Sequence, residues 1–199
     1  MVTVAVQAGG RSSRMGRDKA LIPLAGIPLI EHVLSRAEGL GDELLVTTNR
    51  PDDYAYLGVR MAQDSEPGAG SLHGLLTALE AAQGETVLVL ACDMPFLSRP
   101  LLEHLVGLAD QASVVIPRRG GEFEPLHAVY SRSCVNPIRE ALLSGERRVT
   151  AFLSRVPHLI VGDDTLMGFD PDGWSFFNIN TPRDLARAEQ ILTESPAGP

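Results

Sequence analysis

Paired glycines and basic residues follow the first apolar run of the chain, and this combination suits phosphate binding. Gly9 and Gly10 come directly after residues 4–8, and Arg14 and Lys19 follow in the same stretch. Glycine has no Cβ, so main-chain N–H groups there can turn toward an anion. The spacing matches neither G-x-x-x-x-G-K-[ST] nor G-x-G-x-x-G. We expect a polyphosphate loop of another kind; the competing interpretation is a basic surface turn.

A carboxylate follows a later apolar run and is a candidate metal ligand. Residues 85–91 read as a buried strand, which ends at Asp93 with Pro95 just beyond it. Mg²⁺ prefers oxygen ligands and often binds through one or two carboxylates plus substrate phosphates. We expect Asp93 to bind Mg²⁺; the alternative is a turn or capping carboxylate.

Further polar residues stand where other strands are expected to end. Asn49 follows the strand at 43–48, and Asp64 follows the strand at 59–62. Asn178 and Asn180 alternate on an extended segment and would face the same side. They are candidates for a ligand or metal, although Asn180 and Asp64 can equally serve as cap and turn residues.

Hydrophobic periodicity predicts alternating strands and helices. The expected strands span 2–6, 43–48, 59–62, 85–91, 113–116, 126–130, 158–161 and 176–179, and the expected helices span 28–37, 71–82, 100–108, 135–143, 149–153 and 182–192. This alternation predicts a single α/β domain over 1–194 with a mostly parallel sheet and helices on both faces. Residues 195–199 are expected to be a disordered tail. Ligands of such sheets bind beyond the carboxyl ends of the strands.

Composition narrows the class of protein. The chain has 199 residues, is 44% hydrophobic and carries a formal net charge of -8, so neither a nucleic acid nor a membrane surface is an expected partner. The two cysteines are far apart, and the five histidines lack metal-ligand spacing. No stretch is long and apolar enough for a signal peptide or a membrane span. We therefore expect a soluble cytoplasmic protein.

The candidate residues suit displacement at phosphorus. Lys19 and Arg14 would neutralise developing charge, and Asp93 would hold a metal that bridges phosphate oxygens. No paired nucleophile and base is apparent in the sequence. We predict direct transfer to a bound acceptor.

Four segments together resemble the molybdenum cofactor guanylyltransferases. They are AGGRSSRMGRDKALIPLAGIPLIEHV, CDMPFL, GERRV and FNINTPRDLA, and the similarity covers nearly the whole chain. The resemblance implies a Rossmann-like nucleotidyltransferase fold. It also implies transfer of GMP from GTP to Mo-molybdopterin, with release of pyrophosphate and a requirement for Mg²⁺.

The resemblance further implies roles for matching residues. The GTP loop would comprise Ala8, Gly9 and Gly10, with Arg14 and Lys19 on the phosphates. Asn49 and Asp64 would hold the nucleoside, and Gly70 and Gly74 would line its pocket, while Asp93 would bind Mg²⁺. On the molybdopterin and metal side would lie Arg147 or Arg148, Asn178 and Asn180. Transient contact with molybdenum insertion proteins or molybdoenzyme apoproteins is implied as well.

One departure from the family concerns the base. Leucine is usual where Gln7 stands, and the segment Ser71–Gly74 contains His73 in place of alanine. A glutamine amide can bond to guanine or to another base. A cytidylyltransferase, or a related enzyme with another phosphorylated acceptor, therefore remains an alternative. A noncatalytic nucleotide or cofactor carrier is a further one.

Overall fold

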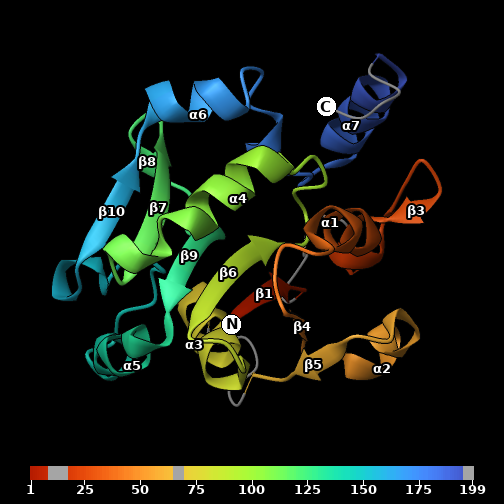
Figure 1. Ribbon diagram of the computed structural model, residues 1–199. Helices are drawn as coiled ribbons and strands as arrows, with labels where there is room; N and C mark the ends of the chain where they lie inside the picture. The colour runs from red at the N-terminus through yellow and green to blue at the C-terminus, as the bar shows by residue number, and fades with distance from the viewer. Residues whose placement is uncertain (9–17, 65–69, 195–199) are drawn as a thin grey trace.

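The fold is built on a mixed sheet, whose strands lie side by side across the molecule in Figure 1. The computed structural model describes residues 1–8, 18–64 and 70–194. The strand order is β10 (His158–Val161), β7 (Val114–Arg119), β9 (His127–Ser131), β6 (Thr86–Ala91), β1 (Val2–Gln7), β4 (Glu43–Thr47) and β5 (Arg60–Ala62), with β8 (Glu122–Phe123) paired to β7. Strand β9 runs antiparallel to both of its neighbours, and β1, β4, β5 and β6 are parallel. The prediction of a mostly parallel sheet is confirmed.

Helices cover both faces of the sheet, as predicted. One face packs against α1 (Leu29–Ala37), α4 (Arg99–Gly107) and α6 (Asp163–Phe169), which stand in front of the sheet in Figure 1. The other face packs against α3 (Ser71–Ala81) and α5 (Val135–Leu143). The short helix α2 (Pro51–Tyr54) follows β4 and contributes the buried Tyr54 to the first face.

The central strands are apolar throughout because both of their faces are covered. Successive side chains of a strand point to opposite sides. Accordingly, Val4 and Val6 belong to the core beneath α1 and α4, whereas Ala5 belongs to the core beneath α3 and α5. Burial of the whole run 4–6 requires this double cover and places β1 in the middle of the sheet.

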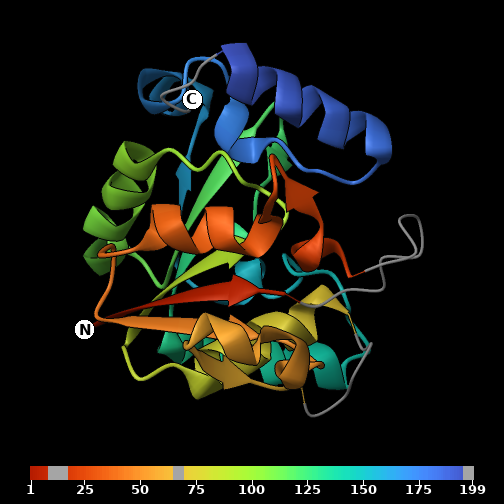
Figure 2. The same ribbon diagram turned by 90° about the vertical axis from the view of Figure 1, so that its right-hand side faces the viewer.

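The C-terminal helix packs on a separate small core at one end of the molecule. Helix α7 (Pro182–Glu194) lies beside the antiparallel pair β2 (Pro23–Leu24) and β3 (Ile27–Pro28), as Figure 2 shows. Ala188 and Ile191 of α7 share this core with Leu24, Phe96 and Ile179. The contact brings the end of the chain to the segment that follows the glycine-rich region.

Two of the predicted elements, the strand at 176–179 and the helix at 149–153, do not form. Residues 176–179 do not form a strand; a 3-10 helix, Trp174–Phe176, leads into an extended segment without a strand partner. Its apolar spacing arises because Phe176 and Ile179 enter different cores. The helix expected at 149–153 is a turn followed by the 3-10 helix Leu153–Arg155. Helices α2 and α6 and the strands β2, β3 and β8 were not anticipated, because each is short.

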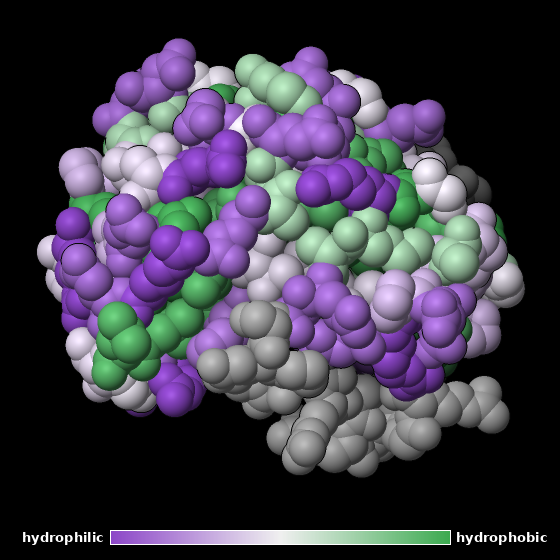
Figure 3. All heavy atoms as spheres, turned by 90° about the horizontal axis from the view of Figure 1, so that it is seen from below, coloured by the Kyte–Doolittle hydropathy of each residue, from purple (hydrophilic) through white to green (hydrophobic). Residues whose placement is uncertain are grey.

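The surface carries scattered apolar residues. The exposed large ones are Met1, Ile27, Tyr56, Leu143 and Met167, on different elements. On the face seen in Figure 3, hydrophilic residues surround small groups of hydrophobic ones. Within the described ranges, no helix is long and apolar enough to cross a membrane. The predicted tail at 195–199 lies outside the described residues.

Gly84 provides a test of how tightly the sheet is closed before β6. A Cβ at this position would lie 2.6 Å from the carbonyl oxygen of Met1 and 2.9 Å from the amide nitrogen of Thr3. Both are backbone atoms, so Gly84→Ala should destabilise the fold by about 1–3 kcal/mol through overpacking. Urea unfolding measures this loss. Gly107→Ala, where a Cβ meets nothing within 4 Å, is the control and should unfold at a urea concentration close to that of the wild type.

Candidate active site at the carboxyl edge of the sheet

The ends of four parallel strands bring most of the predicted site residues to one edge. Gln7 at the end of β1 pairs in register with Thr47 on β4 and Ala91 on β6. Cys92 donates its backbone N–H to the carbonyl oxygen of Gln7 at 3.2 Å, so Asp93 follows immediately beside β1. Convergence of strand ends is the general basis of ligand sites in α/β sheets.

Lys19, Asp93 and Asn180 make direct contact, although they are far apart in sequence. The Lys19 ammonium donates to a carboxylate oxygen of Asp93 and, at 2.5 Å, to Oδ1 of Asn180. The Lys19 and Asp93 side chains are only 19% and 16% exposed. A charge-assisted bond in such partly buried surroundings is stronger than one in open solvent. The structure therefore joins three of the predicted site residues in one cluster.

Local structure fixes Lys19 at this point. It begins the 3-10 helix Lys19–Leu21, and the Asp18 carboxylate accepts the N–H of Ala20 at 3.2 Å. Ala20 is fully buried, so the residue after Lys19 anchors the turn in the core. The ammonium is thereby directed toward the sheet edge.

Asn180 is held by the cap of α7, in which Asp184 takes part as well as the expected cap residue Thr181. The Asp184 carboxylate accepts the N–H groups of Asn180 at 2.9 Å and Thr181 at 2.8 Å, and Thr181 Oγ1 accepts the N–H of Asp184 at 3.2 Å. The T-x-x-D spacing is a capping-box signal that was available in the sequence. Ile179 donates its N–H to the Asp93 carbonyl oxygen at 3.0 Å. The asparagine segment is thus tied directly to the end of β6.

Asn49 and Asp64 form a second pair at the same edge. The Asn49 amide nitrogen donates to Asp64 Oδ2, and the Asp64 N–H donates to Asn49 Oδ1, both at 3.2 Å. The loops after β4 and β5 are held together by this reciprocal contact. Their assignment to the nucleoside remains a prediction.

Gln7 and Gly74 are packed against each other. Gln7 is 7% exposed, and its amide nitrogen has no hydrogen-bond partner among the described residues. A Cβ on Gly74 would lie 3.1 Å from Gln7 Oε1. The first turns of α3 therefore approach the end of β1 closely because residue 74 lacks a side chain.

The remaining predicted positions are divided. Gly70 precedes α3 with φ +104, and a Cβ there would lie 3.9 Å from the carbonyl oxygen of Arg147. Arg147 therefore lies beside the α3 N-terminus, and no hydrogen bond among the described residues joins Arg147 or Arg148 to Asn178 or Asn180. Ala8 is buried, and its N–H donates to the carbonyl oxygen of Thr47 at 2.8 Å.

Three residues of the predicted phosphate loop lie outside the described ranges. They are Gly9, Gly10 and Arg14. Asn178 is half-buried, and its amide donates to the Phe176 carbonyl oxygen at 3.3 Å. The roles assigned to these four residues stay predictions.

Cys92 adjoins Asp93 but is unsuited to act as a nucleophile. Burial, reinforced by the Asp93 charge, raises the pKa of its thiol far above the ordinary value. The neutral thiol is a poor nucleophile. Cys92 is therefore not a candidate for a covalent intermediate.

The oxygen atoms at Asp93 and Asn180 fit a hard divalent cation. Both residues offer oxygen ligands, and both already accept from one ammonium group, which marks the position as one that attracts positive charge. The described residues contain no cluster of three or more His, Cys, Asp or Glu side chains suited to a metal. Mg²⁺ often binds through one or two carboxylates, and substrate phosphates supply its further ligands.

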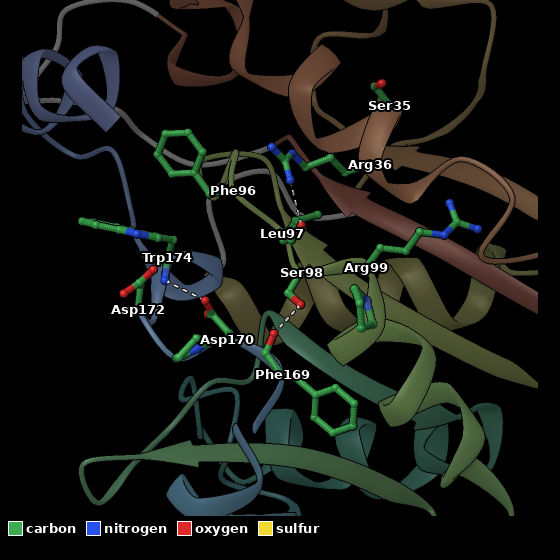
Figure 4. Close-up of a pocket in the computed structure, with 12 residues that line it drawn as sticks. Ser35, Arg36, Phe96, Leu97, Ser98, Arg99, Phe169, Asp170, Asp172 and Trp174 are labelled. Carbon is green, nitrogen blue, oxygen red and sulfur yellow. Dashed lines mark hydrogen bonds between the residues drawn. The ribbon is translucent and has the colours of Figure 1, made fainter. Parts of the chain in front are cut away.

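A pocket of about 560 Å³ lies elsewhere on the molecule. Arg36 of α1, Arg99 of α4 and Trp174 are among its lining residues, as Figure 4 shows. None of the predicted site residues lines it. The contacts at the carboxyl edge, and not this pocket, therefore define the candidate active site.

Comparison with known proteins shows the family of this chain. The sequence profile of the MobA-like NTP transferase domain matches residues 4–159. The chain belongs to this family. A "Molybdenum cofactor guanylyltransferase" of Desulfosudis oleivorans is 34% identical over 96% of each chain. A "Probable molybdenum cofactor guanylyltransferase" of Pelotomaculum thermopropionicum is 33% identical, over 98% of this chain and 96% of the relative.

A solved structure shares the family fold over nearly the full length. The "Molybdopterin-guanine dinucleotide biosynthesis protein A" of Archaeoglobus fulgidus superimposes with a TM-score of 0.84 at 32% identity, covering 96% of this chain and 99% of that one. The family assignment confirms the sequence resemblance and identifies the chain as a member of a nucleotidyltransferase family.

His127, at the first position of β9, is a buried group that the sequence analysis did not single out. It is fully buried, and neither ring nitrogen has a hydrogen-bond partner in the described part of the chain. Burial lowers its pKa to about 3. Histidine in an unfolded chain titrates near a pKa of about 6.5, so between these values the unfolded state alone binds a proton.

Stability should therefore fall as the pH is lowered through this window. From pH 6.5 to pH 5 the wild type should lose about 1.6 kcal/mol of unfolding free energy through His127. Urea unfolding at several pH values measures the slope. The His127→Phe variant lacks the titrating group and should show a shallower slope over the same range. Equal slopes for the two proteins would show that the pKa of His127 does not differ between the folded and unfolded states.

Proposed function

We propose that this protein transfers GMP from GTP to Mo-molybdopterin and releases pyrophosphate. The observation that carries the proposal is the contact of Lys19 with Asp93 and Asn180 at the carboxyl edge, within a fold shared with the A. fulgidus protein. In this reaction a phosphate oxygen of the acceptor attacks the α-phosphorus of GTP. One P–O bond forms, the bond to the β-phosphate oxygen breaks, and pyrophosphate leaves with its electron pair.

The charges at the site suit this displacement. Lys19 would move from Asp93 to the triphosphate, where its ammonium would stabilise charge that develops on the leaving group. Asn180 would remain tied to β6 through the Ile179–Asp93 backbone bond. The Asp184 cap would keep the side-chain amide of Asn180 directed at the acceptor.

Asp93 and Asn180 are the residues that would hold Mg²⁺. A bound Mg²⁺ would supply charge neutralisation for the phosphate oxygens. The two side chains lie on separate elements, the end of β6 and the segment before α7, so the site would join the two halves of the fold.

Base recognition is proposed for the Gln7 side of the edge. The unpartnered amide of Gln7 next to Gly74 is the polar group that would read the purine, with Asn49 and Asp64 on the nucleoside. A preference for cytosine is the second candidate, because the same amide can bond to either base. We place the reaction in the cytoplasm, with product passed by transient contact to molybdenum insertion proteins or molybdoenzyme apoproteins.

Lys19→Ala tests the assignment of the triphosphate site. We expect turnover to fall by roughly two orders of magnitude, the scale of removing one preorganised charge-stabilising donor. The measurement is release of pyrophosphate and formation of the dinucleotide from GTP, Mg²⁺ and Mo-molybdopterin. Arg139→Ala removes an exposed cation paired with Glu80 at 2.8 Å and should leave turnover unchanged. No product from the wild type would refute the proposed function, and normal turnover of Lys19→Ala would remove this lysine from it.

Gln7→Leu tests base selection. Leucine is usual at this position in the family and cannot hydrogen-bond to a base, so Gln7→Leu removes only a contact particular to this chain. We expect kcat/KM for GTP to fall by roughly 10-fold, the effect of losing one hydrogen bond to the substrate. Competition among the four nucleoside triphosphates against the wild type identifies the preferred base. A clear preference for CTP would replace guanine with cytosine in the proposal. An unchanged ranking and rate in Gln7→Leu would show that residue 7 does not read the base.

A further inference from the structure

Phe176 lies at the centre of a side-chain cluster that the proposed reaction does not yet use. Its buried ring packs against the His127 ring, with centroids 4.7 Å apart, and against the Arg119 guanidinium, 5.3 Å from the ring centroid. Arg119 also forms an ion pair with Glu124 at 3.7 Å. We call Phe176, His127, Arg119 and Glu124 the Phe176 cluster.

The other three members of the Phe176 cluster lie on β7, on β9 and on the segment between these strands. Arg119 ends β7 and His127 begins β9. Glu124 lies between them; its N–H donates to the Pro117 carbonyl oxygen at 2.9 Å, and its own carbonyl oxygen accepts the N–H of His127 at 3.1 Å. Burial raises the pKa of Glu124, and the Arg119 charge opposes that shift. Phe176 is therefore contacted by two side chains, His127 and Arg119, that paired strands hold in place.

Phe176 in turn begins the segment that carries the two asparagines. The Asn178 amide donates to the Phe176 carbonyl oxygen at 3.3 Å, and Ile179 donates to the carbonyl oxygen of Asp93 at 3.0 Å. Because residues 176–179 have no strand partner, no ladder of backbone bonds fixes their register. Besides the Ile179–Asp93 backbone bond, the buried side chains of Phe176 and Ile179 on either side of Asn178 hold the segment.

The composition of the cluster supports a positioning role. Aromatic pairs and cation–π contacts have preferred geometries, whereas aliphatic packing alone does not orient a ring. His127 keeps two buried nitrogens without hydrogen bonds in the described structure, which an aliphatic residue would avoid. The His127 ring therefore costs stability at this position.

We propose that the Phe176 cluster positions Asn178 and Asn180 against Lys19 and Asp93, and that it thereby controls binding of the phosphorylated acceptor without contacting the nucleotide. The assignment of the acceptor rests on the proposed function. The positioning itself does not, because it concerns the protein without substrates. Phe176, His127 and Arg119 are positioning residues in this account.

Phe176→Leu removes the ring and keeps an apolar side chain. We expect kcat/KM for the acceptor to fall by roughly 10- to 100-fold, the scale of a displacement of about 1 Å at the reacting groups. KM for GTP should stay within about twofold of the wild type, because uniform binding of the nucleotide is untouched. The proposal would be overturned if kcat/KM for the acceptor did not fall, or if KM for GTP rose by as large a factor.

Phe152→Leu is the matched control. Phe152 is also fully buried and packs against an aromatic ring, that of Tyr130 at 6.3 Å, but it lies in the core on the opposite face of the sheet. It should leave the acceptor kinetics unchanged at a temperature where both variants are folded. Arg119→Gln, which keeps the core intact, should reproduce the acceptor effect in weaker form. Arg155→Gln, which breaks an ion pair with Glu140 at 3.6 Å, should not.

A readout without substrates separates this proposal from the proposed function. Trp174 is the only tryptophan in the chain and stands two residues before Phe176. Its ring packs edge-on against that of Phe177, with the ring centroids 6.0 Å apart. Phe176→Leu should shift its fluorescence and accelerate hydrogen exchange of the Ile179 amide, and Phe152→Leu should do neither. Unchanged exchange in Phe176→Leu would overturn the positioning claim. A wild type that forms no product would refute the proposed function, while the exchange result would still decide the positioning claim.

Discussion

The contact of one ammonium group with Asp93 and Asn180 is the interaction on which the arrangement of this site depends. Lys19 is the only lysine in the chain, and every other basic side chain except histidine is arginine. A lysine head is a compact charge with three donors, whereas a guanidinium is a planar fork. The compact head can bond to two oxygens on separate elements at once. It therefore joins the N-terminal region, the end of β6 and the segment before α7.

This contact is possible because the sheet and α7 bring distant parts of the chain to one edge. The parallel strands β1, β4, β5 and β6 all end there, and the small core beneath α7 holds Ile179 in place. Gln7 with Gly74 and Asn49 with Asp64 occupy the β1 to β5 side, and Asn180 occupies the other. In the proposed reaction the β1 to β5 side would take the nucleotide and the α7 side the acceptor, with Lys19 and Asp93 between them. Two-substrate transfer needs such a division.

Sequence patterns with local causes predicted their elements well. The doubly buried runs of β1 and β6 and the Thr181–Pro182 start of α7 follow from burial and capping, which neighbouring residues specify. The prediction of a strand at 176–179 was wrong because the apolar residues of this segment enter two separate cores and the segment pairs with no strand. The prediction of a helix at 149–153 was wrong for a similar reason. Phe152 and Leu153 are buried against the sheet from a turn and a 3-10 helix.

The sequence by itself determined the fold class, the mostly parallel sheet and the choice of Lys19, Asp93 and the asparagines as candidates. These depend on residue type and short-range spacing, which the chain carries along its length. The tertiary structure alone decided that Lys19 bonds to Asp93 and Asn180, that Arg147 lies beside Gly70, and that Phe176 stacks on His127 and Arg119. Each of these contacts joins residues distant in sequence. Their geometry is set by strand order and by the packing of α7, which no local pattern specifies.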